Sequence, residues 1–399
     1  MKTSDRNTAA PSGRAIELEP NRAATGASGR GSTLARLLTA CALLALAACG
    51  VVPTVPERRA PDLKIVFPQP PDEPRFYYER TLYGSADVVA GEANSALRQL
   101  LTGEGPKGSE GMGKPYAVAV HHGRVFVSDS VQRYVTVFDI PGRRFYRIGD
   151  DGPGQLVKPL GLDVDQAGNL YVADATTKTV VVFDEEGNFL RKLGGAKWFE
   201  RLGSVTIDPK GDRLYVVDVG GVRSNEHRIR VFDPVKGTHL FDFGTRGSGP
   251  GELNLPYDLA VGKDGRLYVV DTGNFRVQVF DRDGKYLSTF GSIGSQVGSF
   301  ARPKEIAVGP DGNLYIIDAL MGHFQIFDPA GNLLLAVGQR AEQDGPARFM
   351  LPSGIHVDGD GRVYVVDQWF RKIDIFRPAK LKADEGYIGV QAPAAAVKK

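Results

Sequence analysis

Cysteine is scarce in this sequence of 399 residues, which contains only Cys41 and Cys49. If residues 1–48 are removed as argued below, Cys49 alone is left, and no disulfide can form within the mature chain. The fold must then depend on a hydrophobic core of sufficient size rather than on cross-links.

Common catalytic motifs are also missing. The sequence has no phosphate-binding P-loop, no GxSxG nucleophile elbow and no CxxC pair. An excess of charge is absent too, because 49 basic and 47 acidic residues leave a net charge of +2, without a dense basic block in the repeated region. This balance does not favour a nucleic-acid partner.

What the sequence does contain is a repeated unit. The stretch GRLYVVDTGNFRVQVFDRDGKYLSTFG at 265–291 recurs as GRVFVSDSVQRYVTVFDIPGRRFYRIG from Gly123 and GNLYVADATTKTVVVFDEEGNFLRKLG from Gly168. Further copies start at Asp212, Gly312 and Gly361, and the last one is shortened. The apolar strands that precede the six copies begin 43 to 54 residues apart. A period of this size indicates a solenoid, a propeller or an array.

Each unit is predicted to form four short strands. In one copy these are YDLAV, RLYVVD, RVQVFD and YLSTFG, which are rich in Val, Tyr and Phe and separated by Gly, Asp and Asn turns. Four strands per unit is the pattern of a propeller blade. The sequence therefore predicts an all-β fold, a six-bladed β-propeller over residues 115–378.

The pattern of an opening proline, IAV, GxLYVVD, NxRVQVFD and GxxLxxFG resembles the NHL repeat. The resemblance covers about residues 115–378 and implies a six-bladed β-propeller. Since the same fold serves binding proteins and enzymes, it does not by itself define a function.

The two ends of the repeat region predict how the ring closes. The sixth copy ends at IDIFRPAK and lacks a fourth strand, whereas RFYYERTLYG at 75–84 stands before the first copy. We expect this N-terminal strand to complete the last blade and so remove an exposed edge. Within the preceding region, 75–114, GEANSALRQLLTG at 91–103 predicts a short amphipathic helix. Residues 379–399 are poor in large apolar side chains and are predicted to be disordered.

The N-terminal segment indicates export. After Arg30 and Arg36, residues 37–48 are apolar except for Thr39, a run too short to span a bilayer but typical of a signal peptide. It ends in LAACG, which resembles the bacterial lipobox and implies cleavage before Cys49 and lipidation of that cysteine. LTAC, ending at Cys41, is a weaker match because few apolar residues precede it. A plain secretory signal with a chance cysteine is the alternative.

These features predict a lipoprotein signal peptide over 1–48 and a lipidated, proline-rich tether over 49–74. By resemblance to Gram-negative lipoproteins, Gly50 after the cysteine implies the periplasmic face of the outer membrane. The lipid would anchor the chain without spanning the bilayer. The predicted partners are therefore the membrane, through this lipid, and a protein of the cell envelope, with no nucleic acid.

The innermost strands should bring unlike residues together around the channel. The first positions after the opening residues are Tyr116, Leu160, Gly203, Tyr257, Lys304 and Ser353, and the next are Ala117, Gly161, Ser204, Asp258, Glu305 and Gly354. Further along, Asp163 and His356 replace the Ala or Thr of other blades. We predict ligand binding at the channel mouth by Tyr116, Asp163, Tyr257, Asp258, Lys304, Glu305 and His356. The alternative is a solvated mouth with ion pairs between blades.

The first functional hypothesis is a binding or scaffolding lipoprotein for a protein or small ligand. It would bind through the loops that are longest and least constrained by the repeat, VGGVRSNEHR at 219–228 and GTRGSGPGELNL at 244–255. The second hypothesis is an extracytoplasmic enzyme, because six-bladed relatives include lyases and gluconolactonase-like hydrolases with a metal on the axis. Of the histidines, only His356 lies on an innermost strand, so the histidine site of the amidating lyases is absent. A channel Ca²⁺ on Asp163, Asp258 or Glu305 remains open, and no other cofactor is predicted.

Two repeated columns are expected to be structural. Aspartates end the second strand of every unit and should accept hydrogen bonds from turn amides: Asp129, Asp174, Asp218, Asp271, Asp318 and Asp367. Basic residues precede the third strand in most units and should pair with carboxylates at the strand ends: Arg133, Lys178, Arg228, Arg276 and Lys372.

Overall fold

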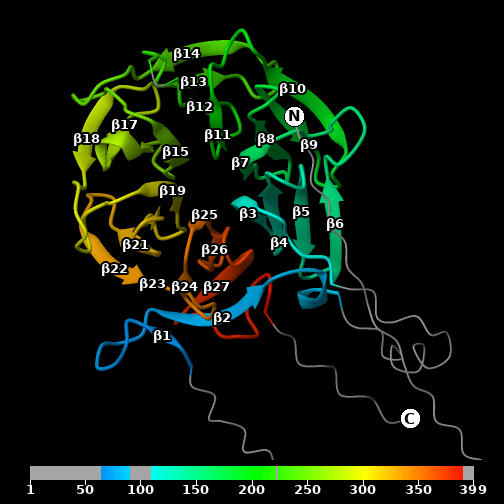
Figure 1. The fold of residues 1–399 in the computed structure, drawn as a ribbon, viewed down its shortest axis with the longest axis vertical. Helices are drawn as coiled ribbons and strands as arrows, with labels where there is room; N and C mark the ends of the chain where they lie inside the picture. The colour runs from blue at the N-terminus through cyan, green and yellow to red at the C-terminus, as the bar shows by residue number, and fades with distance from the viewer. Residues whose placement is uncertain (1–63, 90–108, 222, 390–399) are drawn as a thin grey trace, which may run out of the picture. The chain divides into compact units, whose positions relative to one another are not determined.

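The computed structural model describes residues 64–89, 109–221 and 223–389 (Figure 1). They form six antiparallel sheets around a central axis, with five sheets of four strands and one of five. The predicted six-bladed propeller is confirmed. The signal peptide, Cys49, the residues of the tether before 64 and the expected helix at 91–103 lie outside the described residues.

Five blades are each built from consecutive strands. Blade 1 contains β3 (Pro115–His121), β4 (Arg124–Asp129), β5 (Tyr134–Asp139) and β6 (Arg144–Ile148). Blade 2 contains β7 (Pro159–Val164), β8 (Leu170–Asp174), β9 (Thr179–Phe183) and β10 (Phe189–Gly194). Blade 3 contains β11 (Leu202–Ile207), β12 (Leu214–Asp218), β13 (Arg228–Phe232) and β14 (His239–Phe243).

Blade 4 contains β15 (Pro256–Val261), β16 (Leu267–Asp271), β17 (Arg276–Phe280) and β18 (Tyr286–Phe290). Blade 5 contains β19 (Pro303–Val308), β20 (Leu314–Asp318), β21 (His323–Phe327) and β22 (Leu333–Val337). Two short 3₁₀ turns, η2 (Ser85–Asp87) and η3 (Thr272–Asn274), and a parallel pair, β23 (Gln339–Arg340) with β24 (Arg348–Phe349), lie in the connections.

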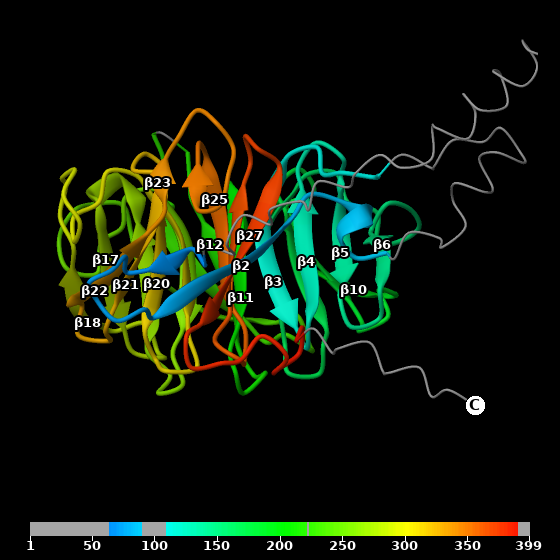
Figure 2. The ribbon, with the colours of Figure 1, turned by 90° about the horizontal axis from the view of Figure 1, so that it is seen from below.

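Blade 6 joins the two ends of the propeller. β25 (Pro352–Val357), β26 (Val363–Asp367) and β27 (Lys372–Pro378) are followed outward by β2 (Phe76–Leu82) and β1 (Val66–Phe67). β2 pairs antiparallel with β27, from Phe76 opposite Pro378 to Leu82 opposite Ile373, and crosses the outside of the blade in Figure 2. The predicted closure by an N-terminal strand is confirmed.

Buried polar contacts fix this closing strand. The fully buried Arg362 donates from Nε to Glu79 of β2 at 2.8 Å. On the same strand, Thr81 donates to Asp374 at 2.5 Å, and Asp374 also pairs with the buried Lys372 at 2.9 Å. Because removing one partner would leave a buried charge unpaired, these contacts strongly favour the closed ring.

The hydrophobic core lies between blades rather than within one blade. Each of the six buried clusters combines side chains of two neighbouring blades, as where Phe126 and Val137 of blade 1 meet Leu170 and Val181 of blade 2. Both faces of the central strands are therefore covered, which explains runs such as LYVVD, whose five residues are all buried.

The repeated aspartates have the predicted structural role. All six are fully buried. Asp129 accepts hydrogen bonds from the amides of Gly113 and Lys114 in the preceding connection and from Val131 and Gln132 in its own turn. The basic column was predicted less well: of its five described residues, only Arg276 pairs with the strand-end aspartate of its blade, Asp271, at 2.8 Å. Arg228 and Lys372 pair with other aspartates, Asp242 at 3.2 Å and Asp374 at 2.9 Å. Arg133 and Lys178 instead occupy left-handed turn positions, with φ of 66° and 55°.

The folded part of the chain ends later than predicted. Residues 379–389 pack against the propeller, where Ile388 is 2% exposed and the carbonyl oxygen of Glu385 accepts a hydrogen bond from Arg362 at 2.8 Å. The predicted disorder of 379–399 is therefore wrong for 379–389, because the buried Ile388 and the hydrogen bond from the buried Arg362 hold this segment against the propeller. Residues 390–399 lie outside the described part.

The two faces of the propeller differ in the loops that form them. We call the connection face the one with the links between blades and the turns between second and third strands. The hairpin face carries the turns between first and second strands, such as 165–169 and 208–213 (Figure 2). In the described part of the chain, no helix is long and apolar enough to cross a membrane.

Candidate functional site in the central channel

The innermost strands share an irregularity that shapes the channel. In all six, the pairing with the second strand shifts register directly after the opening residue, as between Pro256 and Asp258. Such a bulge interrupts the alternation of side chains, so that two successive residues can turn toward the same side. Tyr257 and Asp258 of blade 4, and Lys304 and Glu305 of blade 5, thus all contribute to the channel.

At the connection-face end, two tyrosines meet across the axis. Tyr116 of blade 1 donates a hydrogen bond to the hydroxyl of Tyr257 in the opposite blade 4 at 2.6 Å, and their rings are stacked at 6.2 Å between centroids. Lys304 Nζ lies 5.8 Å from the centre of the Tyr257 ring. These three predicted site residues form one group, separate from the other four.

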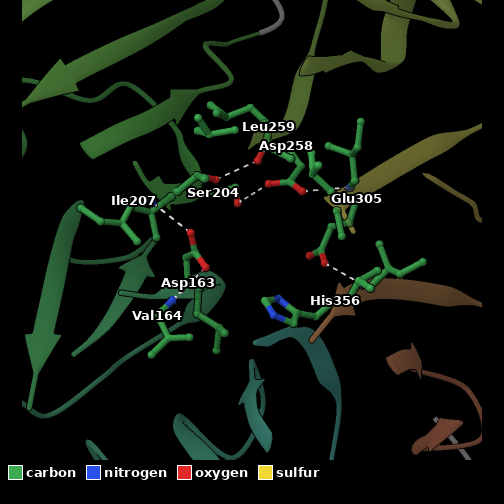
Figure 3. Close-up of a pocket in the computed structure, with 18 of the residues that line it drawn as sticks. Asp163, Val164, Ser204, Ile207, Asp258, Leu259, Glu305 and His356 are labelled. Atoms are coloured by element: carbon green, nitrogen blue, oxygen red, sulfur yellow. Dashed lines mark hydrogen bonds between the residues drawn. The ribbon is translucent and has the colours of Figure 1, made fainter. Parts of the chain in front are cut away.

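Toward the hairpin face, the channel opens into a cavity of about 260 Å³ (Figure 3). Its lining includes the other four predicted residues, Asp163, Asp258, Glu305 and His356. Asp165 and Asp208 of the hairpins also line it, which places its opening on the hairpin face. The residues predicted as one site are therefore divided between two layers along the axis.

The channel carboxylates bind the backbone of the next blade. Asp163 accepts from Ile207 N at 2.9 Å, Asp258 from Ile306 N at 3.1 Å, and Glu305 from Ile355 N at 3.1 Å (Figure 3). An innermost strand has one edge without a strand partner, and its amides need other acceptors. These carboxylates supply them, so the ion pairs expected between blades are replaced by bonds to backbone.

Hydroxyl groups complete this linkage at the remaining junctions. Ser128 binds Leu160 O at 2.6 Å, Thr206 binds Leu259 O at 2.8 Å, and Ser353 binds Tyr116 O at 2.7 Å. Ser204 also donates to Asp258 at 2.7 Å. Every neighbouring pair of blades is thus joined by at least one hydrogen bond from a side chain to an innermost strand. Sequence reasoning missed Ser128 and Thr206, since small hydroxyl residues carry no distinctive signal.

Burial changes the protonation of the channel groups. It raises the pKa of Asp163 to about 7 and that of Asp258 to about 6. Burial and the nearby Asp258 raise the pKa of Glu305 well above its usual value. Burial lowers the pKa of His356 to about 4, so this imidazole is neutral at pH 7. The cavity therefore carries less negative charge at neutral pH than its residue types suggest.

The carboxylates do not converge as metal ligands. Among the described residues, no group of three His, Cys, Asp or Glu side chains could hold a metal ion. For the Ca²⁺ considered above, Asp163, Asp258 or Glu305 would have to exchange backbone hydrogen bonds for coordination, although carboxylate oxygens are suitable ligands.

A basic ring surrounds the channel on the connection face. The residue directly before the opening position is Lys114, Lys158, Arg201 or Arg302 in four blades, and all four are exposed. Their backbone carbonyls accept hydrogen bonds from the residue that follows the second strand, as from Ser130 N to Lys114 O at 3.2 Å. This fixes the base of each side chain near the mouth. Reading the repeat one position earlier would have revealed this column.

Fold and channel together define a six-bladed β-propeller whose innermost strands are joined by side-chain hydrogen bonds. Residues 253–280, in blade 4, match the NHL repeat. The chain is 33% identical over 85 residues to human NHL repeat-containing protein 3, covering 21% of this chain and 23% of that protein. It is 49% identical over 45 residues to the human E3 ubiquitin-protein ligase TRIM32, covering 11% of this chain and 7% of that one. The chain thus matches less than a third of either relative.

Solved structures show the same fold at low sequence identity. A Bacteroides thetaiotaomicron protein of unknown function aligns with a TM-score of 0.56 and 20% identity, covering 75% of each chain. A gluconolactonase of Xanthomonas campestris aligns with a TM-score of 0.51 and 16% identity, covering 67% of this chain and 86% of its own. A streptogramin B lyase aligns with a TM-score of 0.50 and 14% identity, over 67% and 94%. These likenesses concern the fold alone.

Proposed function

We propose that this protein is a lipid-anchored binding module of a bacterial cell envelope, which holds a protein partner on the connection face of its propeller. The observation that carries the proposal is that the acidic side chains of the channel are used to join blades, whereas the exposed side chains lie outside it. The carboxylates that an active site would need bind backbone amides of neighbouring blades. Exposed side chains suited to a partner lie instead on the connection face.

The two loops singled out from the sequence lie on the same face. Residues 219–227 join β12 to β13, and 244–255 join β14 to β15, both on the connection face. Part of the first loop is structural, because the buried His227 accepts a hydrogen bond from Leu255 N at 3.0 Å. The exposed remainder can contact a partner without altering the core.

Crosslinking in intact cells, followed by purification and mass spectrometry, tests this proposal. We expect a reproducible protein partner, and its loss when residues 221–225 are replaced by a two-residue turn that leaves His227 in place. A matched change in the hairpin-face turn 263–265 should leave the crosslink unchanged. Recovery of the propeller without any partner would contradict the proposal.

The anchor is tested separately by labelling cells with an alkyne-bearing fatty acid. We expect Cys49→Ser to abolish the label and to release the protein from the membrane fraction, whereas Cys41→Ser should do neither. A labelled Cys49→Ser variant would contradict lipidation at this residue.

One observation favours the enzyme hypothesis as a second candidate. The hairpin-face cavity contains the imidazole of His356, which has no hydrogen-bond partner among the described residues, together with Asp163 and Glu305. A neutral histidine near carboxyl groups can act as a general base. Metal analysis of the purified protein and a screen of lactone hydrolysis would test this, with His356→Ala expected to abolish any activity found.

A further inference from the structure

Lys304 is a buried lysine that lacks an acceptor. The residue is 5% exposed, and within the described part of the chain its Nζ has neither a hydrogen bond nor an ion pair, only the contact with the Tyr257 ring. Glu305, its neighbour in sequence, uses Oε2 to bind Ile355 N. A buried ammonium without an acceptor is unfavourable unless solvent or a ligand supplies one.

Solvent does reach this ammonium. Among described side chains, Gln132 Oε1 and His323 Nε2 are the polar atoms both sealed from solvent and without a partner. Lys304 Nζ is not one of them. Its charged neighbours include Arg302 and Lys114 before the innermost strands and Asp367 at the end of β26, all on the connection face. The ammonium therefore lies at the mouth on that face.

The tyrosine ring that this ammonium contacts carries a second unused donor. The Tyr257 hydroxyl accepts a hydrogen bond from Tyr116 at 2.6 Å, and no group of the described residues accepts the proton of Tyr257 itself. The contact between Lys304 and Tyr257 thus involves two donors without acceptors, one of them charged. This is the arrangement that a carboxylate, with its two acceptor oxygens, can satisfy.

The surroundings of Lys304 favour a negative ligand. Burial lowers the pKa of Lys304, and the positive charges of Arg302 and Lys114 lower it further, whereas Glu305 and Asp367 act in the opposite direction. Of the two nearby acidic groups, Glu305 is bound to Ile355 N, and Asp367 accepts four backbone hydrogen bonds, including those of Met350 and Leu351. Neither neutralises the mouth by direct pairing.

Apolar side chains lie around this basic centre. Nine exposed ones belong to the connections or turns of the same face, among them Val131, Leu320 and Trp369 at equivalent turn positions in the adjacent blades 1, 5 and 6. Two of the nine are aromatic, Trp369 and Tyr83, and the Tyr83 hydroxyl already donates to Asp344 at 2.8 Å. Single-stranded nucleic acids are held by several stacking aromatic rings. The surface suits an acidic peptide with apolar residues better than RNA.

We propose that the connection-face mouth binds a carboxylate of an acidic, apolar-bearing segment of a protein partner, which Lys304 and Tyr257 contact directly. The basic ring of Lys114, Lys158, Arg201 and Arg302 attracts the segment, and the apolar side chains around it pack against the flanking residues. This inference rests on the proposed binding function and names the chemistry of the partner.

Fluorescence anisotropy with the full chain tests the inference. The probe is a fluorescein-labelled peptide of four Glu-Leu-Gly repeats, compared with Gln-Leu-Gly, Glu-Ser-Gly and an oligouridine of equal charge. We expect the first peptide to bind at least about tenfold more tightly than each of the others, with an affinity that falls as salt rises. Equal binding of the Gln-Leu-Gly peptide, or tighter binding of oligouridine, would overturn the proposal.

Variants locate the contact. We expect Lys304→Met to weaken binding about tenfold and Tyr257→Phe about threefold, because each removes one donor to the carboxylate. Lys210→Met, on the hairpin face, removes the same charge and should leave binding unchanged. Thermal unfolding shows whether each variant is folded. If Lys304→Met does not fold, Tyr257→Phe still tests the contact.

The same variants separate this inference from the proposed function. A partner crosslinked in cells equally by wild type and Lys304→Met would refute the inference and leave the binding function standing. Peptide binding that depends on Lys304, without any partner in cells, would support the site and contradict the envelope function.

Discussion

The two ends of the channel use the same strands for opposite purposes. At the connection face, Lys304 and Tyr257 present donors without acceptors, inside a ring of exposed basic residues. Toward the hairpin face, Asp163, Asp258 and Glu305 have backbone donors supplied by the next blade. On β15 and β19, adjacent residues about 3.3 Å apart along the strand thus separate a surface with unused hydrogen-bonding capacity from one where it is used internally.

This difference shows that a charged residue on a propeller axis is not in itself a sign of a ligand site. The decisive property is whether its polar atoms are already bound by the protein. The carboxyl groups of Asp163, Asp258 and Glu305 are already bound to backbone amides and join blades, whereas the ammonium of Lys304 is available to a ligand. Four experiments test this distinction.

The largest expected effect concerns Asp258. Replacing Asp258 by alanine leaves Ile306 N and Ser204 Oγ without their acceptor, and the free energy of unfolding should fall by about 3 kcal/mol. Asp258→Asn keeps one carbonyl acceptor without the buried charge and should cost less than about 1 kcal/mol. Urea unfolding measures both. An alanine variant as stable as the asparagine variant would show that this carboxylate does not join the blades.

The pH dependence of stability tests Asp163. Its pKa is raised by burial to about 7 in the folded protein, so between about pH 4 and pH 7 the folded state binds the proton that the unfolded state has lost. The contribution of Asp163 to the free energy of unfolding is thus largest at low pH and falls as pH rises. Between pH 5 and pH 8, wild type should lose about 2 kcal/mol more than Asp163→Asn. Parallel curves in urea unfolding would contradict a raised pKa.

The contact across the axis is tested by a double-mutant cycle. Tyr116→Phe and Tyr257→Phe each remove the hydrogen bond between the two hydroxyls. The loss of unfolding free energy in the double variant should therefore be smaller than the sum of the losses in the two single variants. We expect a coupling energy of about 1 kcal/mol. A coupling of zero would show that the two tyrosines do not interact in solution, and that this end of the channel is open.

The smallest effect expected is on peptide affinity as a function of pH. Burial and the nearby Arg302 lower the pKa of Lys304 to about 8, so its charge is lost as pH rises through this value. Affinity for the Glu-Leu-Gly peptide should fall about fivefold between pH 7 and pH 9. Arg302, Glu305, Lys114, Asp367 and Tyr257 also lie near this ammonium, and Lys304→Met is the control for the effect of pH on every other group. An identical decline in that variant would exclude Lys304 as the cause.

Much of the fold was predictable because it repeats. The aspartates at the strand ends recur in every copy, and a residue that appears six times in one place is explained by local hydrogen bonding. The closing strand was predictable from the absence of a fourth strand after Lys372–Pro378. The order of residues 379–389 was not, because it depends on Ile388 and Arg362, each of which occurs once.

The candidate site was predictable in position but not in arrangement. Counting from the opening prolines identified Tyr257, Asp258, Lys304 and Glu305 as channel residues. That Tyr116 meets Tyr257 depends on the number of blades, since only a ring of six places the first and fourth blades opposite each other. Asp258 binds Ile306 N because the innermost strand of the next blade has an edge without a strand partner. No sequence pattern shows which amide on that edge the carboxyl group reaches.

The strand that closes the ring also sets the order in which the molecule can be completed. Phe76–Leu82 emerges from the ribosome before any complete blade, yet its partner Lys372–Pro378 follows the strands of all the other blades. Until then the growing polypeptide is an open arc with an unpaired edge at each end, and contacts so distant in sequence form late. A chain cut short before Lys372 leaves both edges exposed to pairing with other molecules, so the ring can close only once Lys372–Pro378 has been made.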